Sequence, residues 1–146
     1  MPQIEIRQAQ NDDAHRISDL LFQLGYETEP SKIEVLVSKS LCSDGNIYVG
    51  VRNGDVIAVI SLIYFEYLSS AEKSCRITSI VVDKSIRGAG IGTVLIEHAK
   101  KRAIEEGCQI IEVTTSLLRE QTQAYYESIG FSKSSYKYVQ KLGNNI

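Results

Sequence analysis

Ile80-Val81-Val82-Asp83-Lys84-Ser85-Ile86-Arg87-Gly88-Ala89-Gly90-Ile91-Gly92-Thr93 is the most informative stretch of this sequence. It begins as an apolar run typical of a strand and leads into a segment whose apolar residues recur at helical spacing. A glycine-rich turn between a strand and a helix lets a ligand approach the backbone N–H groups closely. The first N–H groups of the helix add a partial positive charge, so the stretch predicts a phosphate or pyrophosphate site. Arg87 adds a fixed cation beside it.

Other interpretations of the glycine turn are weaker. The P-loop pattern GxxxxGK[ST] is absent. The dinucleotide fingerprint GxGxxG would need a glycine where Thr93 stands, although Glu112 follows near the place of the ribose-binding acid. That fingerprint normally opens a βαβ repeat, whereas an antiparallel hairpin is predicted before this turn. A plain strand-to-helix turn is the remaining alternative, but three alternate glycines exceed what such a turn needs.

The rest of the chain supplies alternating strand and helix patterns on both sides of this turn. Strands are predicted over residues 4–7, 47–51, 56–65, 76–82, 110–115 and 136–141. Helices are predicted from a cap at Asn11 or Asp12 to Gly25, from a cap at Ser31 to Leu41, along a stripe from Val94 to Ala103 that Gly107 ends, and over 120–129. The Asn53-Gly54 pair between two strands is a strong hairpin signal. The order β-α-α-β-β-β-α-β-α-β therefore predicts an α+β fold of mixed layers, in one domain over residues 1–146.

Composition excludes several classes of protein. The chain has 146 residues, of which 43% are hydrophobic and 23% charged, as in an ordinary globular domain. A net charge of −2 argues against a nucleic-acid binder. The longest apolar run, 56–65, is far short of the ~20 residues of a membrane helix, and no signal-peptide pattern is present. Three scattered cysteines favour a reducing compartment. We therefore expect a cytoplasmic protein without nucleic-acid or membrane partners, and no metal site.

Two motifs resemble those of one enzyme family. The stretch 80–92 resembles the acetyl-CoA-binding motif [Q/R]-x-x-G-x-[G/A] of the GNAT superfamily of N-acetyltransferases, matched by Arg87, Gly90 and Gly92. Residues 124–131, Ala-Tyr-Tyr-Glu-Ser-Ile-Gly-Phe, resemble the family's FYExxGF signature. The resemblance covers essentially the whole chain. It implies a GNAT-like fold, with a central, mostly antiparallel twisted sheet, helices on both faces, and fourth and fifth strands that splay apart.

The resemblance also implies acetyl-CoA as co-substrate. The pantetheine arm would pair with the backbone of Ile80 and Val82 on the fourth strand, and Val81 between them is counted with this cofactor-binding stretch. The pyrophosphate would lie on the N–H groups of Arg87, Gly88, Ala89, Gly90, Ile91, Gly92 and Thr93. Arg119 stands where many members carry a pantetheine-binding asparagine, and it would either reach a CoA phosphate or be solvated. Ser116 is a candidate for the missing polar contact.

Tyr126 matches the family tyrosine that acts as general acid on the departing CoA thiolate. A phenol with a pKa near ~10 is protonated at neutral pH and can donate. The alternative is aromatic core, which we expect for Tyr125. No carboxylate stands on the fourth strand to act as base. Glu66 and Glu112 are the nearest substitutes, but each is more typical of a solvated strand residue, and a water chain would also serve.

In the family, the first two helices and their connection cover the acceptor. Tyr26, Glu27 and Glu29 in that connection suit a cationic amine, with Glu66 as a further candidate; an exposed acidic loop is the alternative.

The end of the chain resembles members that acetylate small amines, including aminoalkylphosphonates and aminoglycosides. We therefore predict acetyl transfer from acetyl-CoA to a small-molecule primary amine, directly in a ternary complex. A non-catalytic acyl-CoA-binding module and a protein lysine or N-terminal acetyltransferase are the alternatives. Family members often pair into homodimers, so a homodimer is a further expectation.

Overall fold

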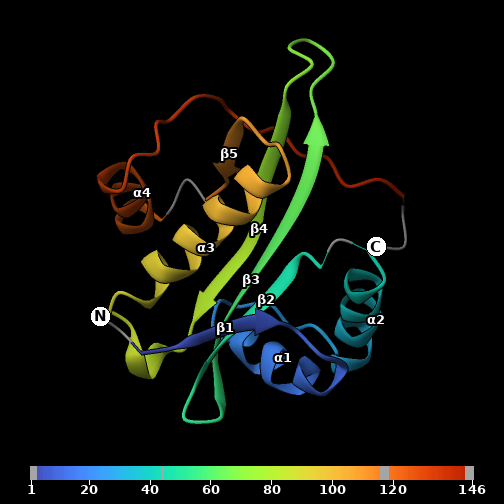
Figure 1. Ribbon diagram of the computed structural model, residues 1–146, viewed down its shortest axis with the longest axis vertical. Coiled ribbons are helices and arrows are strands. Elements are labelled where there is room, and N and C mark those ends of the chain that lie inside the picture. The colour runs from blue at the N-terminus through green and yellow to red at the C-terminus, as the bar shows by residue number, and fades with distance from the viewer. Residues whose placement is uncertain (1–2, 44, 116–118, 144–146) are drawn as a thin grey trace. The chain divides into compact units, whose positions relative to one another are not determined.

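The structure is a computed structural model that describes residues 3–43, 45–115 and 119–143. The chain divides into two compact units, the first ending at Thr114 and the second beginning at Thr115. The first contains the sheet and the helices α1, α2 and α3, and the second contains α4 (Figure 1).

A five-stranded sheet forms the centre of the first unit. Its strands lie side by side in chain order: β1 (Glu5–Gln8), β2 (Ile47–Arg52), β3 (Asp55–Glu66), β4 (Lys73–Val82) and β5 (Ile110–Val113). The first three pairings are antiparallel and the pairing of β4 with β5 is parallel. Asn53 and Gly54 join β2 to β3 with φ angles of 51° and 82°, the left-handed conformation that a tight hairpin turn requires. The predicted α+β class with an antiparallel front is therefore confirmed.

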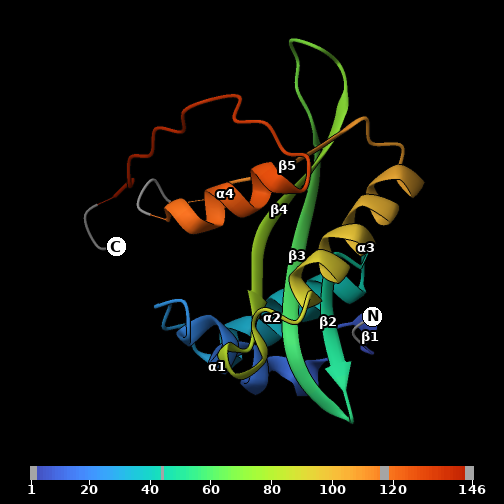
Figure 2. The same cartoon turned by 90° about the vertical axis from the view of Figure 1, so that its left-hand side faces the viewer.

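Helices cover both faces of this sheet, as Figure 2 shows. On one face, α1 (Ala14–Phe22) and α2 (Pro30–Leu41) bury apolar side chains against β2, β3 and β4. On the other face lies α3 (Ile91–Glu105), close enough to β2 that a Cβ on Gly50 would lie 3.9 Å from Leu95. The period-two alternation of the strands therefore supplies apolar side chains to two layers of core.

Two short 3₁₀ turns among the described residues connect regular elements of the first unit. The first, η1 (Asn11–Asp13), precedes α1, and the Asp13 carboxylate accepts hydrogen bonds from the Gln10 N–H and from Arg7. The second, η2 (Lys84–Ile86), follows β4. Because η1 intervenes, α1 has Asp13 as its N-cap instead of Asn11 or Asp12. In α2, Pro30 occupies the first turn and Glu29 is the N-cap, so the predicted cap at Ser31 is wrong.

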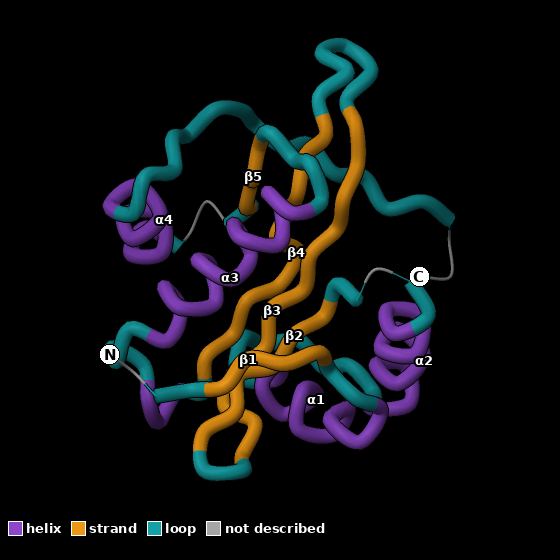
Figure 3. The backbone as a smooth tube through the Cα atoms, in the orientation of Figure 1, coloured by secondary structure: helices purple, strands orange, loops and turns teal. Residues whose placement is uncertain are grey.

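The predicted final strand is also wrong. In the second unit, α4 (Glu120–Ser128) is followed by residues without regular secondary structure, including 136–141, which are drawn as loop in Figure 3. The prediction rested on alternation alone. Alternation does not by itself provide partners for backbone N–H and C=O groups, and Tyr136 and Tyr138 are 81% and 92% exposed.

Candidate functional site

The fourth strand continues beyond its parallel neighbour. Paired residues run from Ser74 with Ile110 to Ile77 with Val113, where β5 ends. From there to Val82, β4 has only β3 as a partner among the described residues. One edge of this part of β4 thus presents backbone N–H and C=O groups, which an extended ligand can pair with as an added strand.

The three residues predicted to meet the pantetheine arm lie on this free edge. The Val81 side chain is 2% exposed and belongs to the core beneath α1 and α2. Ile80 and Val82 are half-buried. The buried side chain of Val81 is therefore closed to a ligand, and the backbone groups of Ile80 and Val82 are the ones that face the free edge. The carbonyl of Val82 accepts a hydrogen bond of 3.0 Å from Nε of Arg87.

The glycine loop follows η2 and ends at α3. Gly88 has φ +87°, and Gly90, the N-cap of α3, has φ +82°. Residues other than glycine rarely adopt this left-handed backbone conformation. A Cβ on Gly88 would meet nothing within 4 Å, so the conformation and not the space requires glycine there. Gly92 lies within the first turn of α3.

The start of α3 has the features of an anion site. The first N–H groups of a helix lack intrahelical acceptors, and the helix dipole makes this end positive. No acidic side chain stands in the first turn of α3. Ile91 is 1% exposed and anchors that turn in the core, Thr93 is half-buried, and Arg87, Gly88 and Ala89 are exposed. This end of the helix thus fits a phosphate group.

Sequence reasoning missed the side chains that anchor this loop. Asp83, which directly follows β4, forms an ion pair with Arg16 of α1. Lys84 donates its backbone N–H to Oε1 of Gln23, the C-cap of α1, at 2.8 Å. These contacts join residues more than 60 positions apart in the chain. Apolar periodicity and motif spacing contain no signal for such a pairing.

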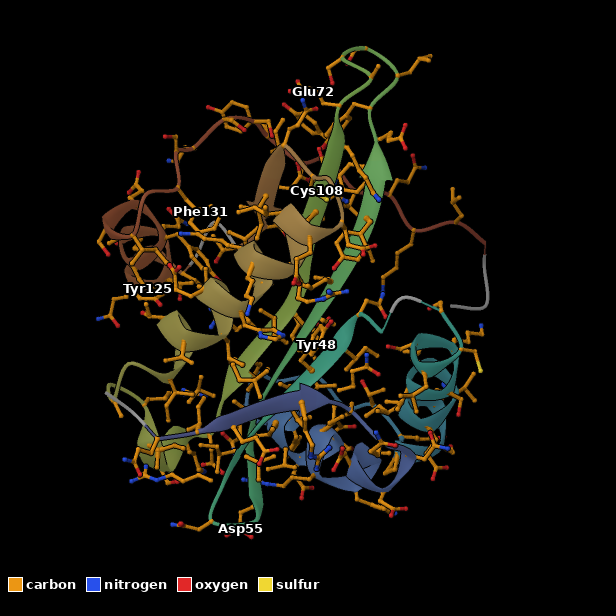
Figure 4. All side chains as sticks on the ribbon, in the orientation of Figure 1. Tyr48, Asp55, Glu72, Cys108, Tyr125 and Phe131 are labelled. Atoms are coloured by element: carbon orange, nitrogen blue, oxygen red, sulfur yellow. The ribbon has the colours of Figure 1, made fainter. Side chains whose placement is uncertain are left out.

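In the second unit, Tyr126 is the buried tyrosine of α4. Its ring lies 5.6 Å from that of Tyr125 and 5.7 Å from that of Phe131, residues labelled in Figure 4. Burial raises the pKa of the Tyr126 phenol above its ordinary value, while Arg119 opposes that shift. The group is therefore protonated at neutral pH. Tyr125, expected in the core, is only half-buried.

The two remaining residues predicted near the cofactor are on or near the start of α4. Arg119 is the exposed N-cap of this helix. Its exposure is compatible with either of the two roles considered for it. Ser116 lies outside the described residues.

The candidate bases lie in different surroundings. Oε1 of Glu112 lies 2.5 Å from Nε of Arg76, and the Tyr67 hydroxyl donates to the same carboxylate at 2.9 and 3.1 Å. The Arg76 guanidinium also lies 4.6 Å from the centre of the Phe65 ring. Arg76 and Tyr67 thus engage both oxygens of this carboxylate. The structure therefore favours a structural role for Glu112.

Glu66 stands apart from the other predicted acceptor contacts. It is the exposed last residue of β3, opposite Lys73 in the β3–β4 hairpin. Figure 1 shows this end of the hairpin away from α1 and α2. The structure therefore does not bring Glu66 together with Tyr26 and Glu27.

The connection between α1 and α2 forms an open depression of about 360 Å³. Its lining combines three carboxylates, two aromatic rings and two hydroxyls: Ser18, Asp19, Phe22, Tyr26, Glu27, Thr28 and Glu29. Oγ of Ser18 donates to the carbonyl of Thr28 at 2.7 Å, which ties the connection back to α1. Acidic groups beside exposed rings favour a cation. Tyr26 and Glu27, neighbours in the sequence, both line this depression.

No described helix has both the length and the apolar character needed to cross a membrane. The described residues also hold no group of three or more metal-ligating side chains.

Comparisons with known proteins agree with this geometry. The chain matches the Acetyltransferase (GNAT) family over residues 11–131. It is 27% identical over 145 residues to the aminoalkylphosphonate N-acetyltransferase of Salmonella typhimurium, covering 97% of this chain and 94% of that protein. It is 28% identical over 120 residues to the peptidyl-lysine N-acetyltransferase YjaB of Escherichia coli, covering 81% and 68%. The solved structure of aminoglycoside N-acetyltransferase AAC(6')-Iy in complex with CoA superposes with a TM-score of 0.83 at 17% identity, over 96% of this chain and 95% of that one. The last likeness concerns the fold alone.

Proposed function

The chain belongs to the acetyltransferase (GNAT) family and is an N-acetyltransferase, and from this premise we propose that it acetylates the primary amine of a small molecule with acetyl-CoA. One observation carries the proposal: the free edge of β4 leads directly into a left-handed glycine loop at the start of α3. A flexible arm can pair with the first feature while a pyrophosphate binds the second. Their order along the chain matches the order of these groups in CoA.

The backbone does most of the cofactor binding in this proposal. Ile80 and Val82 offer N–H and C=O groups to the pantetheine amides, whereas those of Val81, the residue between them, face β3. The pyrophosphate accepts hydrogen bonds from the loop and from the first turn of α3, which includes Ile91, Gly92 and Thr93. The exposed Arg87 and Arg119 are the proposed cationic contacts to CoA phosphates.

The chemistry proposed is direct transfer in a ternary complex. The amine nitrogen attacks the thioester carbonyl, an N–C bond forms, and the C–S bond breaks. The phenol of Tyr126 gives its proton to the departing thiolate. Because Glu112 is held by Arg76, we propose that water takes the proton released by the amine.

The acceptor is proposed to bind at the depression of the α1–α2 connection. Tyr26 offers an aromatic face that is 61% exposed, and Glu27 a carboxylate, to a cationic amine. The relative that acts on aminoalkylphosphonates supports a small molecule. The relative that acts on peptidyl-lysine supports a protein lysine as the second candidate.

The wider assembly is proposed as follows. Residues 1–146 form one catalytic domain, which is supported by a family match running across the boundary between the two units. The protein acts in the cytoplasm and pairs into a homodimer. Sedimentation at micromolar concentration tests the last point, since a monomer mass would contradict it.

An unbiased acceptor screen tests the proposed function. The protein is mixed with acetyl-CoA and a panel of diamines, aminoalkylphosphonates, aminoglycosides and lysine peptides. Release of free CoA thiol and the product mass are then measured. We expect turnover with a small amine. Turnover only with peptides would favour the second candidate, and CoA binding without any turnover would identify a non-catalytic acyl-CoA-binding module.

A further inference from the structure

Helix α1 holds the entrance of the glycine loop through one arginine. Arg16, in the first turn of α1, donates from Nε to the carbonyl of Val56 on β3 at 2.8 Å and pairs its terminal nitrogen with the Asp83 carboxylate. One guanidinium thus ties helix, strand and loop together. Its side chain is 35% exposed and that of Asp83 is 14% exposed, so water only partly screens the pair.

Asp83 links this ion pair to the backbone of the loop through hydrogen bonds of its own. Its Oδ1 accepts hydrogen bonds from both the backbone N–H and the hydroxyl of Ser85 at 3.0 Å, which caps η2. Its own N–H donates to the carbonyl of Ile57 at 2.8 Å. The hydrogen bond from the Ser85 backbone N–H, followed by that from Arg16, lowers the pKa of Asp83 to about 2. The carboxylate is therefore charged at neutral pH, and its two oxygens are bound by Arg16 and Ser85.

A second contact comes from the other end of α1. Gln23, its C-cap, accepts the N–H of Lys84 through Oε1 at 2.8 Å. The loop entrance is thus held at both ends of one helix. The same helix end leads within three residues to Tyr26 in the α1–α2 connection.

We propose that Arg16 and Gln23 are positioning residues that hold the loop from Asp83 to Gly90 in the conformation that binds the CoA pyrophosphate. The inference rests on the proposed function of that loop. A loop that is ordered before binding loses less conformational entropy when the ligand arrives, which strengthens binding. Neither side chain needs to touch CoA for this effect.

The decisive variant is Arg16→Gln, with Arg7→Gln as its matched control. Arg7 forms a comparable ion pair with Asp13, with side chains 36% and 9% exposed, and its hydrogen bonds go to Gln8 of β1 and Asp13 of η1. We expect Arg16→Gln to raise the Kd for CoA about tenfold, equivalent to about 1.4 kcal/mol. Arg7→Gln should keep the Kd within about twofold, even where the two variants lose similar thermal stability.

Two further readouts and two further variants separate positioning from general destabilisation. Amide hydrogen exchange over residues 83–90, without CoA, should be faster in Arg16→Gln and unchanged in Arg7→Gln. The KM for acetyl-CoA should rise while kcat at saturation is retained. Arg16→Lys, which keeps a charge for Asp83, should restore part of the affinity. Gln23→Leu should raise the Kd about threefold without a loss of fold, and it carries the test if Arg16→Gln does not fold.

Equal CoA affinities in Arg16→Gln and Arg7→Gln would overturn the inference while leaving the proposed function intact. So would unchanged exchange of the loop amides in both Arg16→Gln and Gln23→Leu. Failure of the unsubstituted protein to bind CoA by calorimetry would instead remove the proposed function and this inference with it.

Discussion

At the residue scale, local motifs identify groups whose role depends on their own backbone or ring. Gly88 and Gly90 are recognisable from sequence because a left-handed φ selects glycine. Tyr126 is recognisable from its signature. Arg16 and Asp83 are not, because their pairing depends on how α1 packs against β3. The engagement of Glu112 by Arg76 and Tyr67 likewise becomes visible only in three dimensions.

The first prediction concerns the proposed acid. Tyr126→Phe keeps the ring that packs with Tyr125 and Phe131 but removes the proton donor. We expect kcat to fall by about 100-fold, with the KM for acetyl-CoA nearly unchanged, because general-acid catalysis typically contributes factors of this size. Stopped-flow or steady-state release of CoA thiol measures this. Tyr125→Phe is the control and should retain activity; an unchanged kcat in Tyr126→Phe at all pH values would remove the acid role.

The second prediction concerns the acid stability of Asp83. Its pKa of about 2 lies below the ordinary value of 3.8, so the unfolded chain takes up this proton first as the pH falls. The stabilisation is present above about pH 4 and is lost as the pH falls towards 2. In Asp83→Asn, the melting temperature should be lower at neutral pH and fall less steeply over this range. Arg16→Gln should flatten the curve similarly, whereas a slope equal to the unsubstituted protein's in both variants would contradict the linkage.

At the element scale, periodicity predicts which segments become helices and strands but not all of their ends. The strand predicted from residue 76 begins at Lys73, because the fully buried Ser74 and Cys75 pair with β3 and β5. The polar character of Ser74 concealed this. The prediction of a final strand is wrong for a different reason. Residues 136–141 have an alternating pattern, but they pair with no strand in the described structure. Pairing partners, and not propensity, decide such segments.

The third prediction uses the two ends of α3. Gly90 at its start and Gly107 after its end have φ of +82° and +81°. An alanine at either position is strained by about 1 kcal/mol, so both variants should lower the melting temperature by similar amounts. Only Gly90→Ala should weaken CoA binding, by about tenfold or more, because only this end presents N–H groups to a phosphate. Calorimetric titration of both variants checks this, and equal affinities would argue against a pyrophosphate site at the loop.

At the scale of the whole molecule, the sequence specifies the layered first unit well. Strand alternation on two faces predicts two helix layers, and the Asn53-Gly54 turn sets the hairpin. The net charge of −2 is compatible with a cationic acceptor, while Arg87 adds local positive charge at the loop. The second unit carries a motif but little patterned core, so its organisation beyond α4 could not be predicted from hydrophobic periodicity.

The last prediction links ligand binding to the stability of the whole chain. If residues 1–146 act as one domain, heating should give a single transition in which the calorimetric and van't Hoff enthalpies agree. Acetyl-CoA at about a hundred times its Kd adds about 2.7 kcal/mol to the free energy of unfolding, which corresponds to a rise of roughly 5–10 °C in Tm for a domain of this size. At the same acetyl-CoA concentration, Gly90→Ala should show a smaller rise and Gly107→Ala the full one, because the rise depends on affinity for the folded state. Two separate transitions, of which only one responds to acetyl-CoA, would contradict the single domain, and an equal rise in both variants would contradict the loop as the cofactor site.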